Sequence, residues 1–326
     1  MLADPAIAFL LRSDEPAIRR ATLVELLETR LGDAAVRETS RNLLAGPLVA
    51  GLLAGMHPDA SFGVHPYAKW SGAHWRLVSL ADLGVTTADD PRLGRAFESV
   101  LRWLGPAHRE GVPVIDGLAR RCGSQEGNAL IVGVHLGLAR DERVAALASS
   151  LVRWQWPDGG WNCDKRPGAR HSSFNETWHA SIGLARFAAA AGDGDARDAA
   201  QRGAEFVLRH RVLLSERTGL LVHPSMAKLH HPPYWHYDLL AGLRVLAATG
   251  RLGDSRASGA LDRLVAARRP DGTWQPGGRW WRRPGSHGTN VEVVDWGSGP
   301  SAPLTLSVLR VLRAAGRWTA SGGFRG

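Results

Sequence analysis

The alternation of apolar and polar positions predicts helices along nearly the whole chain of 326 residues. Two short amphipathic helices are expected at residues 5–12 and 15–29, and Asp14-Glu15-Pro16 supplies a cap and a proline at the start of the second. Two kinds of helical pattern then alternate. Charged, amphipathic segments are expected at residues 40–55, 92–104, 142–155, 196–210 and 257–268. Apolar segments rich in small residues are expected at residues 74–83, 126–138, 176–190, 236–249 and 303–315.

This alternation predicts a layered helical architecture. A segment that is apolar all round belongs in an inner layer, and a segment with one polar face belongs in an outer layer. Glycines follow the inner segments where a helix C-cap is expected, at Gly84, Gly192, Gly250 and Gly316. The predicted fold is therefore all-α, a single α/α toroid of about five to six helical hairpins, with an open solenoid as the alternative. No linker divides residues 1–326, and residues 1–35 are expected to form N-terminal helices that pack on the barrel.

One short phrase recurs between these segments. It reads Pro-Asp-small-small-aromatic and occurs in His57-Pro58-Asp59-Ala60-Ser61-Phe62, Trp156-Pro157-Asp158-Gly159-Gly160-Trp161 and Arg269-Pro270-Asp271-Gly272-Thr273-Trp274. A recurring unit of this kind indicates a repeat architecture. The aspartate and the small residues favour a tight turn, and the aromatic ring can cover it and pack on the neighbouring helix ends. We therefore interpret the phrase as structural.

The stretch 151–161, Leu-Val-Arg-Trp-Gln-Trp-Pro-Asp-Gly-Gly-Trp, resembles the Gln-Trp repeat of the squalene and hopene cyclases. Those proteins share an α/α toroid with the β subunits of protein prenyltransferases. The copy at residues 268–274 lacks the glutamine, and the copy at 57–62 is more degenerate. The similar architecture runs from about residue 40 onward, and the length matches one toroid. The resemblance implies a divergent, single-domain bacterial member of this superfamily with a biosynthetic activity.

The catalytic motifs of that superfamily are incomplete here. Class II terpene cyclases use an Asp-x-Asp-Asp acid, whereas Thr87-Ala88-Asp89-Asp90 lacks the first aspartate. Asp90 as an N-cap with Pro91 at the first helical position accounts for the pair structurally. Protein prenyltransferases hold zinc with Asp-x-Cys and a distant histidine, and residues 162–177 contain no Asp-x-Cys. Lys165, Arg166 and Arg170 resemble the family's diphosphate-binding residues, or they belong to a solvated loop.

The candidate site lies where the inner helices begin, because parallel inner helices would bring their first turns together at one end of a cavity. These first turns are rich in polar and aromatic residues, and capping by Ser124 or Ser173 explains part of this. The candidate catalytic residues are Glu176, Glu126, His179, His74, His236 and Asp238. The candidate substrate-binding residues are Trp70, Trp75, Cys122, Gln125, Asn128, Arg170, Phe174, Asn175, Trp178, Tyr234, Trp235 and Trp281.

Two chemistries fit these residues. A carboxylate whose pKa is raised by an apolar wall, or a histidine, can serve in acid–base catalysis, and aromatic faces can stabilise a cation. Three histidines with carboxylates can instead bind zinc or iron. No histidine spacing typical of a metal site occurs at these positions, so we expect no metal and no cofactor. Cys122 and Cys163 are interpreted as small apolar residues rather than a catalytic thiol. The long loop 275–299 is expected to be a lid or a binding loop.

Composition narrows the partners. The net charge of +9 comes mostly from arginine and indicates either solvated helix faces or an anionic ligand. No nucleic-acid motif and no apolar run long enough to span a membrane is present. Two cysteines exclude a disulfide framework, and the start Met1-Leu2-Ala3-Asp4-Pro5 is unlike a signal peptide, so a cytoplasmic location is expected.

The first functional hypothesis is an enzyme similar in scaffold to terpene cyclases and prenyltransferases. It would act on a small, partly apolar and possibly anionic substrate by acid–base or cation chemistry in the central cavity. The alternatives are a lipid- or metabolite-binding toroid without catalysis, a metal-dependent enzyme, and a carbohydrate-active barrel that uses two carboxylates.

Overall fold

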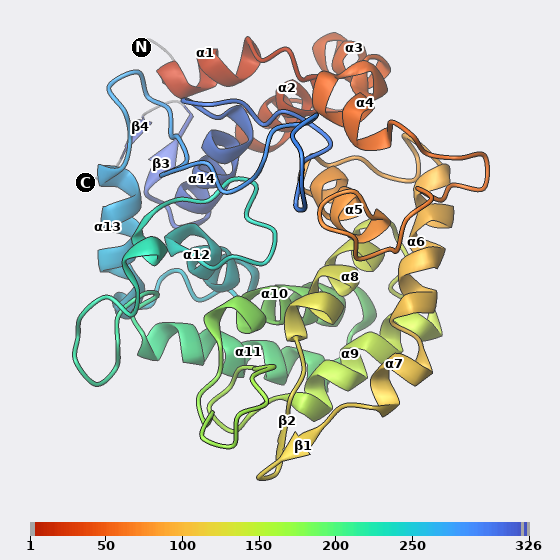
Figure 1. Cartoon of the computed structure of the whole chain (residues 1–326). Coiled ribbons are helices and arrows are strands. Elements are labelled where there is room, and N and C mark those ends of the chain that lie inside the picture. The colour runs from red at the N-terminus through yellow and green to blue at the C-terminus, as the bar shows by residue number, and fades with distance from the viewer. Residues whose placement is uncertain (1–3, 321–322, 325–326) are drawn as a thin grey trace.

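The inner and outer helices alternate along the chain as the hydrophobic pattern predicts, and they form two concentric layers (Figure 1). The computed structural model describes residues 4–320 and 323–324, so the first three residues of the N-terminal segment lie outside it. The inner helices of the described residues are α2 (Pro16–Ala21), α5 (Ala73–Asp82), α8 (Gly123–His135), α10 (Phe174–Ala191), α12 (Leu239–Ala248) and α14 (Ala302–Ala314). The outer helices are α1 (Pro5–Leu11), α4 (Pro47–Leu53), α6 (Arg92–Trp103), α9 (Glu142–Trp154), α11 (Gly194–Arg209) and α13 (Ser258–Ala266).

The layers close into a ring, which confirms the predicted all-α toroid. Along the inner layer α5 contacts α8, α8 contacts α10, α10 contacts α12, and α12 contacts α14. The ring continues from α14 to α2, and α4 contacts α5. Each outer helix from α6 onward also packs against an inner neighbour. The remaining elements are α3 (Ala34–Arg41), α7 (Pro106–Glu110), four short helical turns, and the two-stranded ribbons β1 (Val114–Ile115) with β2 (Leu118–Ala119) and β3 (Trp318–Thr319) with β4 (Gly323–Phe324).

The predicted helix at residues 40–55 is wrong as a single element. The structure has α3, then a single turn at residues 43–45, and then α4, which begins at Pro47. Proline lacks the backbone N–H that a helix interior needs, so it starts a new helix here instead of continuing the old one. The predicted helix at 15–29 is also shorter, because α2 passes at Thr22 into a π-helical turn.

Two capping predictions shift in register. Cys122, and not Ser124, is the N-cap of α8, so Ser124 lies inside the first turn. Pro91 is the N-cap of α6, one residue after the expected Asp90. The Asp90 side chain still accepts from the N–H of Arg92 at 2.9 Å. Asp89 pairs with Arg20 at 2.9 Å. Both carboxylates of the Asp-Asp pair therefore serve local structure.

The repeated phrase forms one turn in all three places. The first residue donates its N–H to the carbonyl of the fifth: His57 to Ser61 at 2.9 Å, Trp156 to Gly160 at 2.8 Å, and Arg269 to Thr273 at 2.9 Å. The fourth residue takes the left-handed conformation each time, with φ of 65° at Ala60, 99° at Gly159 and 87° at Gly272. The shared sequence thus encodes a shared backbone.

The tryptophan that ends this turn ties an outer helix to the next inner helix. The Trp161 indole donates to the carbonyl of Leu151 in α9 at 2.9 Å, and the Trp161 N–H donates to the Thr177 hydroxyl of α10 at 3.2 Å. Trp274 repeats both bonds, to Leu264 of α13 at 2.8 Å and to Thr305 of α14 at 3.1 Å. This bonding fixes where α10 and α14 begin.

Gly159→Ala should lower the free energy of unfolding by about 1–3 kcal/mol, because a left-handed residue with a side chain is strained. The added Cβ would also lie 2.4 Å from the Arg202 carbonyl oxygen. Urea denaturation followed by circular dichroism measures the change. Gly168→Ala is the matched control, because a Cβ there meets nothing within 4 Å, and it should stay within about 0.5 kcal/mol of wild type. Equal stability of the two variants would contradict this account of the turn.

Candidate functional site

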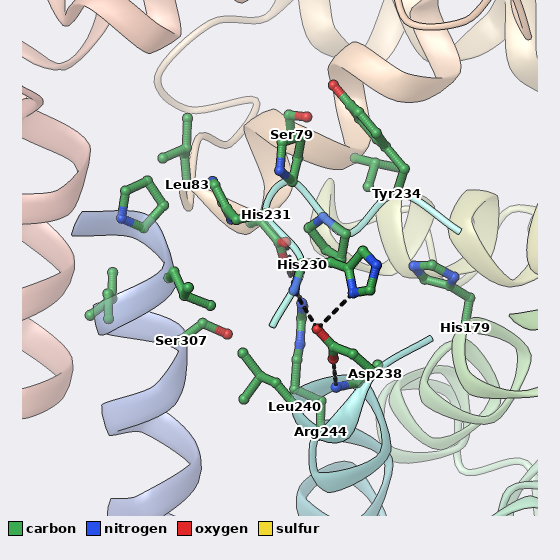
Figure 2. A pocket seen from close by; sticks show the side chains of 18 of the residues that line it. Ser79, Leu83, His179, His230, His231, Tyr234, Asp238, Leu240, Arg244 and Ser307 are labelled. Carbon is green, nitrogen blue, oxygen red and sulfur yellow. Dashed lines mark hydrogen bonds and ion pairs between the residues drawn. The ribbon is translucent and has the colours of Figure 1, made fainter. Parts of the chain in front are cut away.

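A cavity lies on the axis of the toroid, and each of the six inner helices contributes a side chain to its wall (Figure 2). These side chains include Ile18 of α2, Ser79 of α5, Asn128 of α8, His179 of α10, Arg244 of α12 and Ser307 of α14. The loop between α11 and α12 covers one end with His230, His231 and Tyr234. The cavity measures about 60 Å³, so it accommodates a few small groups rather than a whole lipid chain.

Asp238 and His230 form a buried pair at the start of α12. Asp238 caps the helix by accepting from the Ala241 N–H at 2.8 Å. Its other oxygen accepts from the His230 N–H at 2.6 Å and lies 3.4 Å from His230 Nδ1. The His230 ring is stacked on Trp280, with the ring centres 3.9 Å apart. The carboxylate therefore holds the backbone of His230, while the ring nitrogen Nδ1 makes no hydrogen bond within the described residues.

Several polar groups that reach the cavity have no partner within the described residues. Asn128 is fully buried, and both atoms of its amide lack a hydrogen bond. The same holds for Nδ1 of buried His179 and for Nε2 of His231. A buried polar group without a partner costs free energy, so such groups facing one cavity indicate water or a polar ligand.

Burial lowers the pKa of four histidines in this region, His74, His179, His231 and His236. Burial lowers the pKa of His231 to about 4, and burial followed by the charge of Arg244 lowers the pKa of His179 well below its usual value. Burial also lowers the pKa of His74 to about 3 and the pKa of His236 to about 4. Neutral imidazoles can accept a proton or a hydrogen bond, but they do not supply an acid at pH 7.

An acid is available at the cavity rim. The Tyr234 hydroxyl donates to Glu292, which lies in the loop before α14 and is 3% exposed. Burial raises the pKa of Glu292 to about 7. A carboxyl group with a pKa near the working pH is suited to general acid–base catalysis. Tyr234 itself lines the cavity, whereas Glu292 lies behind it and is not part of the cavity wall.

Aromatic rings surround this pair. Trp70 is stacked on Tyr234 with the ring centres 3.8 Å apart, and Trp75 meets Trp70 edge to face at 4.9 Å. Trp235 packs against the same group, and its carbonyl accepts from the Trp178 indole at 3.3 Å. The predicted residues Trp70, Trp75, Tyr234 and Trp235 thus form one cluster, of which Tyr234 reaches the cavity.

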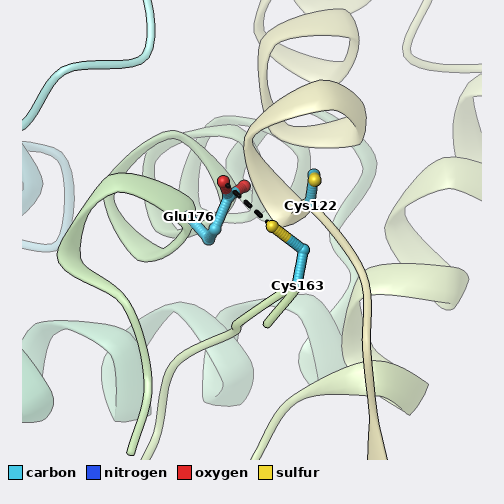
Figure 3. Close-up of side chains that lie close together, drawn as sticks. All are labelled: Cys122, Cys163 and Glu176. Carbon is cyan, nitrogen blue, oxygen red and sulfur yellow. Dashed lines mark hydrogen bonds between the residues drawn. The ribbon is translucent and has the colours of Figure 1, made fainter. Parts of the chain in front are cut away.

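The predicted acid Glu176 lies elsewhere, at the mouth between α8 and α10 (Figure 3). One of its oxygens accepts from Ser124 N–H at 3.0 Å and from the Ser124 hydroxyl at 2.7 Å. The other lies 3.7 Å from the sulfur of Cys163, and Cys122 lies close by. One ligand atom from each of Cys122, Cys163 and Glu176 lies within 4.8 Å of the other two, and this donor set suits zinc.

Glu126 lies beside that mouth and is fully buried. Arg121 donates to one of its oxygens at 2.9 Å and 2.5 Å, while the second oxygen has no partner within the described residues. Burial raises the pKa of Glu126, and it raises the pKa of Glu176 as well. Neither carboxylate lines the central cavity.

The remaining predicted residues are dispersed. His74 is buried among Tyr67, Trp75 and Trp103, and Gln125 lies in the first turn of α8. Phe174 packs on Phe206 and Tyr237, and Asn175 accepts from the Tyr237 N–H at 2.8 Å. His236 stacks on Trp235. Trp281 lies under Arg279.

The basic loop does not reach the cavity. Arg170 is exposed and pairs with Asp116 of the β1–β2 turn at 3.1 Å. Arg166 is exposed and pairs with Asp164 at 2.5 Å. Of the predicted site residues, Asn128, Trp178, His179, Tyr234 and Asp238 line the central cavity.

Sequence reasoning missed Glu292 and did not assign His230, His231 or Arg244 to the site. Glu292 is the carboxylate of a Val-Glu-Val-Val run inside the aromatic loop 275–299. An acidic residue between valines is a signal of burial, but nothing in the sequence places it against Tyr234, which lies 58 positions away.

Comparison with known proteins gives distant structural likenesses. No family model matches the chain, and no curated protein matches its sequence. A protein from Actinoplanes has 18% identity over 96% of this chain and 89% of its own, with a TM-score of 0.45. The type II terpene cyclase MstE from Scytonema has 14% identity over 86% of this chain and 98% of its own, with a TM-score of 0.31. A variant of that cyclase solved with geranylgeranyl dihydroxybenzoate has 15% identity over 85% and 99%, with a TM-score of 0.28. Scores this low carry no argument about activity.

No helix among the described residues has the length and hydropathy required to cross a bilayer.

Glu292→Gln should remove a pH dependence of stability. The folded-state pKa of about 7 lies above the ordinary value of 4.5, so the folded chain binds more protons between these values. Stability of the wild type should therefore fall as the pH rises through that window, by about 3 kcal/mol relative to the variant. Urea unfolding of both proteins at pH 5 and pH 8 measures this difference. A difference that does not change with pH would place the Glu292 carboxyl in solvent.

Proposed function

We propose that this chain is an enzyme that uses the terpene-cyclase type of toroid for acid–base chemistry on a small, partly apolar and anionic molecule. The observation that carries the proposal is the Glu292–Tyr234 pair, a buried carboxyl hydrogen-bonded to the hydroxyl of a tyrosine that lines the axial cavity. Protonated Glu292 would donate to the Tyr234 oxygen while the Tyr234 hydroxyl donates its own proton into the cavity. The sequence resemblance to squalene and hopene cyclases supports the same reading, because those enzymes begin by protonating an alkene or epoxide.

The cavity supplies the other parts that such a reaction needs. A positive charge that develops on the substrate would face the rings of Trp178, Tyr234 and Trp296. Neutral His179 would accept the proton that is lost at the end, with the Asn128 amide orienting a polar group of the substrate. His230, whose backbone N–H is bonded to Asp238, is the alternative base. These roles return the proton count to its starting value, as an isomerisation or cyclisation requires.

Tyr234→Phe should lower turnover about 100-fold or more, because it removes the hydroxyl between Glu292 and the cavity while keeping the ring that stacks on Trp70. Native mass spectrometry of the purified wild type would identify a copurified ligand. That ligand and a panel of prenyl diphosphates would then be incubated with each protein and followed by liquid chromatography and mass spectrometry.

Trp281→Phe is the control, because Trp281 does not line the cavity and should leave turnover within a few-fold of wild type. Wild-type turnover in Tyr234→Phe would remove this residue from the mechanism. Tight binding of a ligand that the wild type never converts would favour a binding protein instead.

A metal-dependent enzyme is the second candidate, and the Cys122–Cys163–Glu176 group favours it. Ser124 holds one oxygen of Glu176 and leaves the other facing the sulfur of Cys163. Two sulfurs and one carboxylate oxygen would supply three ligands of a tetrahedral zinc and leave one position for water or substrate. Bound zinc would act there as a Lewis acid.

Zinc should copurify at about one equivalent per chain if this second candidate holds, and Cys163→Ser should weaken its binding at least tenfold. Inductively coupled plasma mass spectrometry measures the stoichiometry, and the absorption of cobalt in place of zinc reports thiolate ligands. His171→Ala is the control, because His171 is exposed on the same loop and its backbone carbonyl keeps its bond to Asn162. An intact mass 2 Da below the reduced mass would show a disulfide and exclude the zinc site.

A further inference from the structure

A second, wider cavity opens at the other end of the toroid, where the inner helices finish. It measures about 800 Å³, and side chains from the C-terminal halves of α5, α8, α10, α12 and α14 line it. We call it the arginine funnel, because Arg186, Arg244, Arg310 and Arg313 all line it. Asp82, Arg244, Ser307 and Arg310 line both the funnel and the axial cavity, so the two spaces meet at this level.

Three of these arginines have partners. Arg244 pairs with Asp82 at 2.7 Å where the two spaces meet. Two nitrogens of Arg310 donate hydrogen bonds to the Glu25 carboxylate, each at 2.6 Å, and Arg313 forms an ion pair with Glu28. Arg186 differs, because its guanidinium makes no hydrogen bond or ion pair within residues 4–320 and 323–324. Its side chain is exposed at the funnel, and the charges of Asp82 and Glu25 offset part of its own charge without a direct contact.

The helix dipole does not explain why an arginine occupies position 186 of α10. A cation stabilises a helix when it lies in the last turn, near the free carbonyl groups. Arg186 lies five positions before Ala191, the last residue of α10, so it is more than one turn from that end. Its charged neighbours act in both directions. Desolvation, followed by the charge of Arg244, lowers the pKa of Arg186, whereas Asp82 and Glu25 raise it. An anion near the two guanidinium groups would offset the repulsion between them.

The funnel wall around Arg186 is apolar and built from small side chains. Ala185 and Ala189 flank it on α10, and Ala247 and Ala248 of the neighbouring helix α12 line the funnel together with Ile182. Small residues leave the volume open, and their methyl groups offer no hydrogen bonds. A ligand that fills this space therefore has an apolar body next to its charged group.

We propose that the arginine funnel binds the phosphate or diphosphate group of an amphiphilic small molecule, with Arg186 as its principal contact and Arg244 as the second. Guanidinium groups bind phosphate oxygens in pairs, and a polyanionic group can engage both arginines at once. The apolar body would lie along the alanine wall. This assignment goes beyond the proposed function by naming the anionic group and its place, and it rests on that function only for the link to the axial cavity.

Binding can be measured without turnover. Isothermal titration calorimetry with octyl phosphate, octanoate and inorganic phosphate tests the charged group and the apolar wall separately. We expect octyl phosphate to bind the wild type at least tenfold more tightly than octanoate, and also more tightly than inorganic phosphate. Arg186→Gln should weaken octyl phosphate binding at least tenfold. Arg197→Gln is the matched control, an exposed arginine on outer helix α11 that should bind like the wild type.

Three results would overturn the assignment: no binding of octyl phosphate by the wild type, equal affinity for octyl phosphate and octanoate, or full affinity in Arg186→Gln. Vesicles of anionic phospholipid distinguish a lipid headgroup from a soluble phosphate. Capture of the wild type but not of Arg186→Gln would assign a headgroup, and no capture would assign a soluble ligand. Tyr234→Phe should bind octyl phosphate normally, so failure of this site and failure of the proposed chemistry give different results.

Discussion

The bonding of the repeat tryptophan is the constraint on which the rest of this structure depends. Trp161 and Trp274 each join the end of an outer helix to the first turn of the next inner helix, through an indole bond and a backbone bond to a buried threonine. Because this connection fixes the start of an inner helix, first turns that are far apart in sequence meet at one end of the ring. His179 of α10 faces the axial cavity for this reason, together with Asn128 of the neighbouring helix α8.

The ring then separates two environments along its axis. At the end where the inner helices start, buried rings and neutral histidines surround a carboxyl whose pKa is about 7. At the end where they finish, arginines line an open and partly apolar space. A narrow cavity of about 60 Å³ and a funnel of about 800 Å³ share the wall residues Asp82, Arg244, Ser307 and Arg310, and the proposed ligand would place its body in the funnel. The third group, Cys122, Cys163 and Glu176, lies outside this axis at the mouth between α8 and α10.

Much of the fold was predictable because it depends on periodicity. The predicted limits of α6, α9 and α14 agree with the structure within two residues, and Gly192 takes the left-handed C-cap conformation that its place after α10 predicts. The prediction of one helix over residues 40–55 was wrong because Pro47 divides an otherwise helical pattern.

The site was less predictable than the fold. Its residues on inner helices, such as His179, follow from the convergence of first turns, whereas Glu292 depends on the path of an irregular loop that no periodicity describes. The sequence also did not predict a role for Arg186, because a single arginine in a helical pattern does not indicate that the side chain lines a cavity.

A crystal structure of the protein with its copurified ligand, or with octyl phosphate where none copurifies, tests the central claim most directly. The account predicts an anionic group between Arg186 and Arg244, with the ligand continuing toward Asn128, His179 and the Tyr234 hydroxyl. A ligand that avoids the axis and lies at Cys122, Cys163 and Glu176, or on the exposed loop at Arg166 and Arg170, would contradict it.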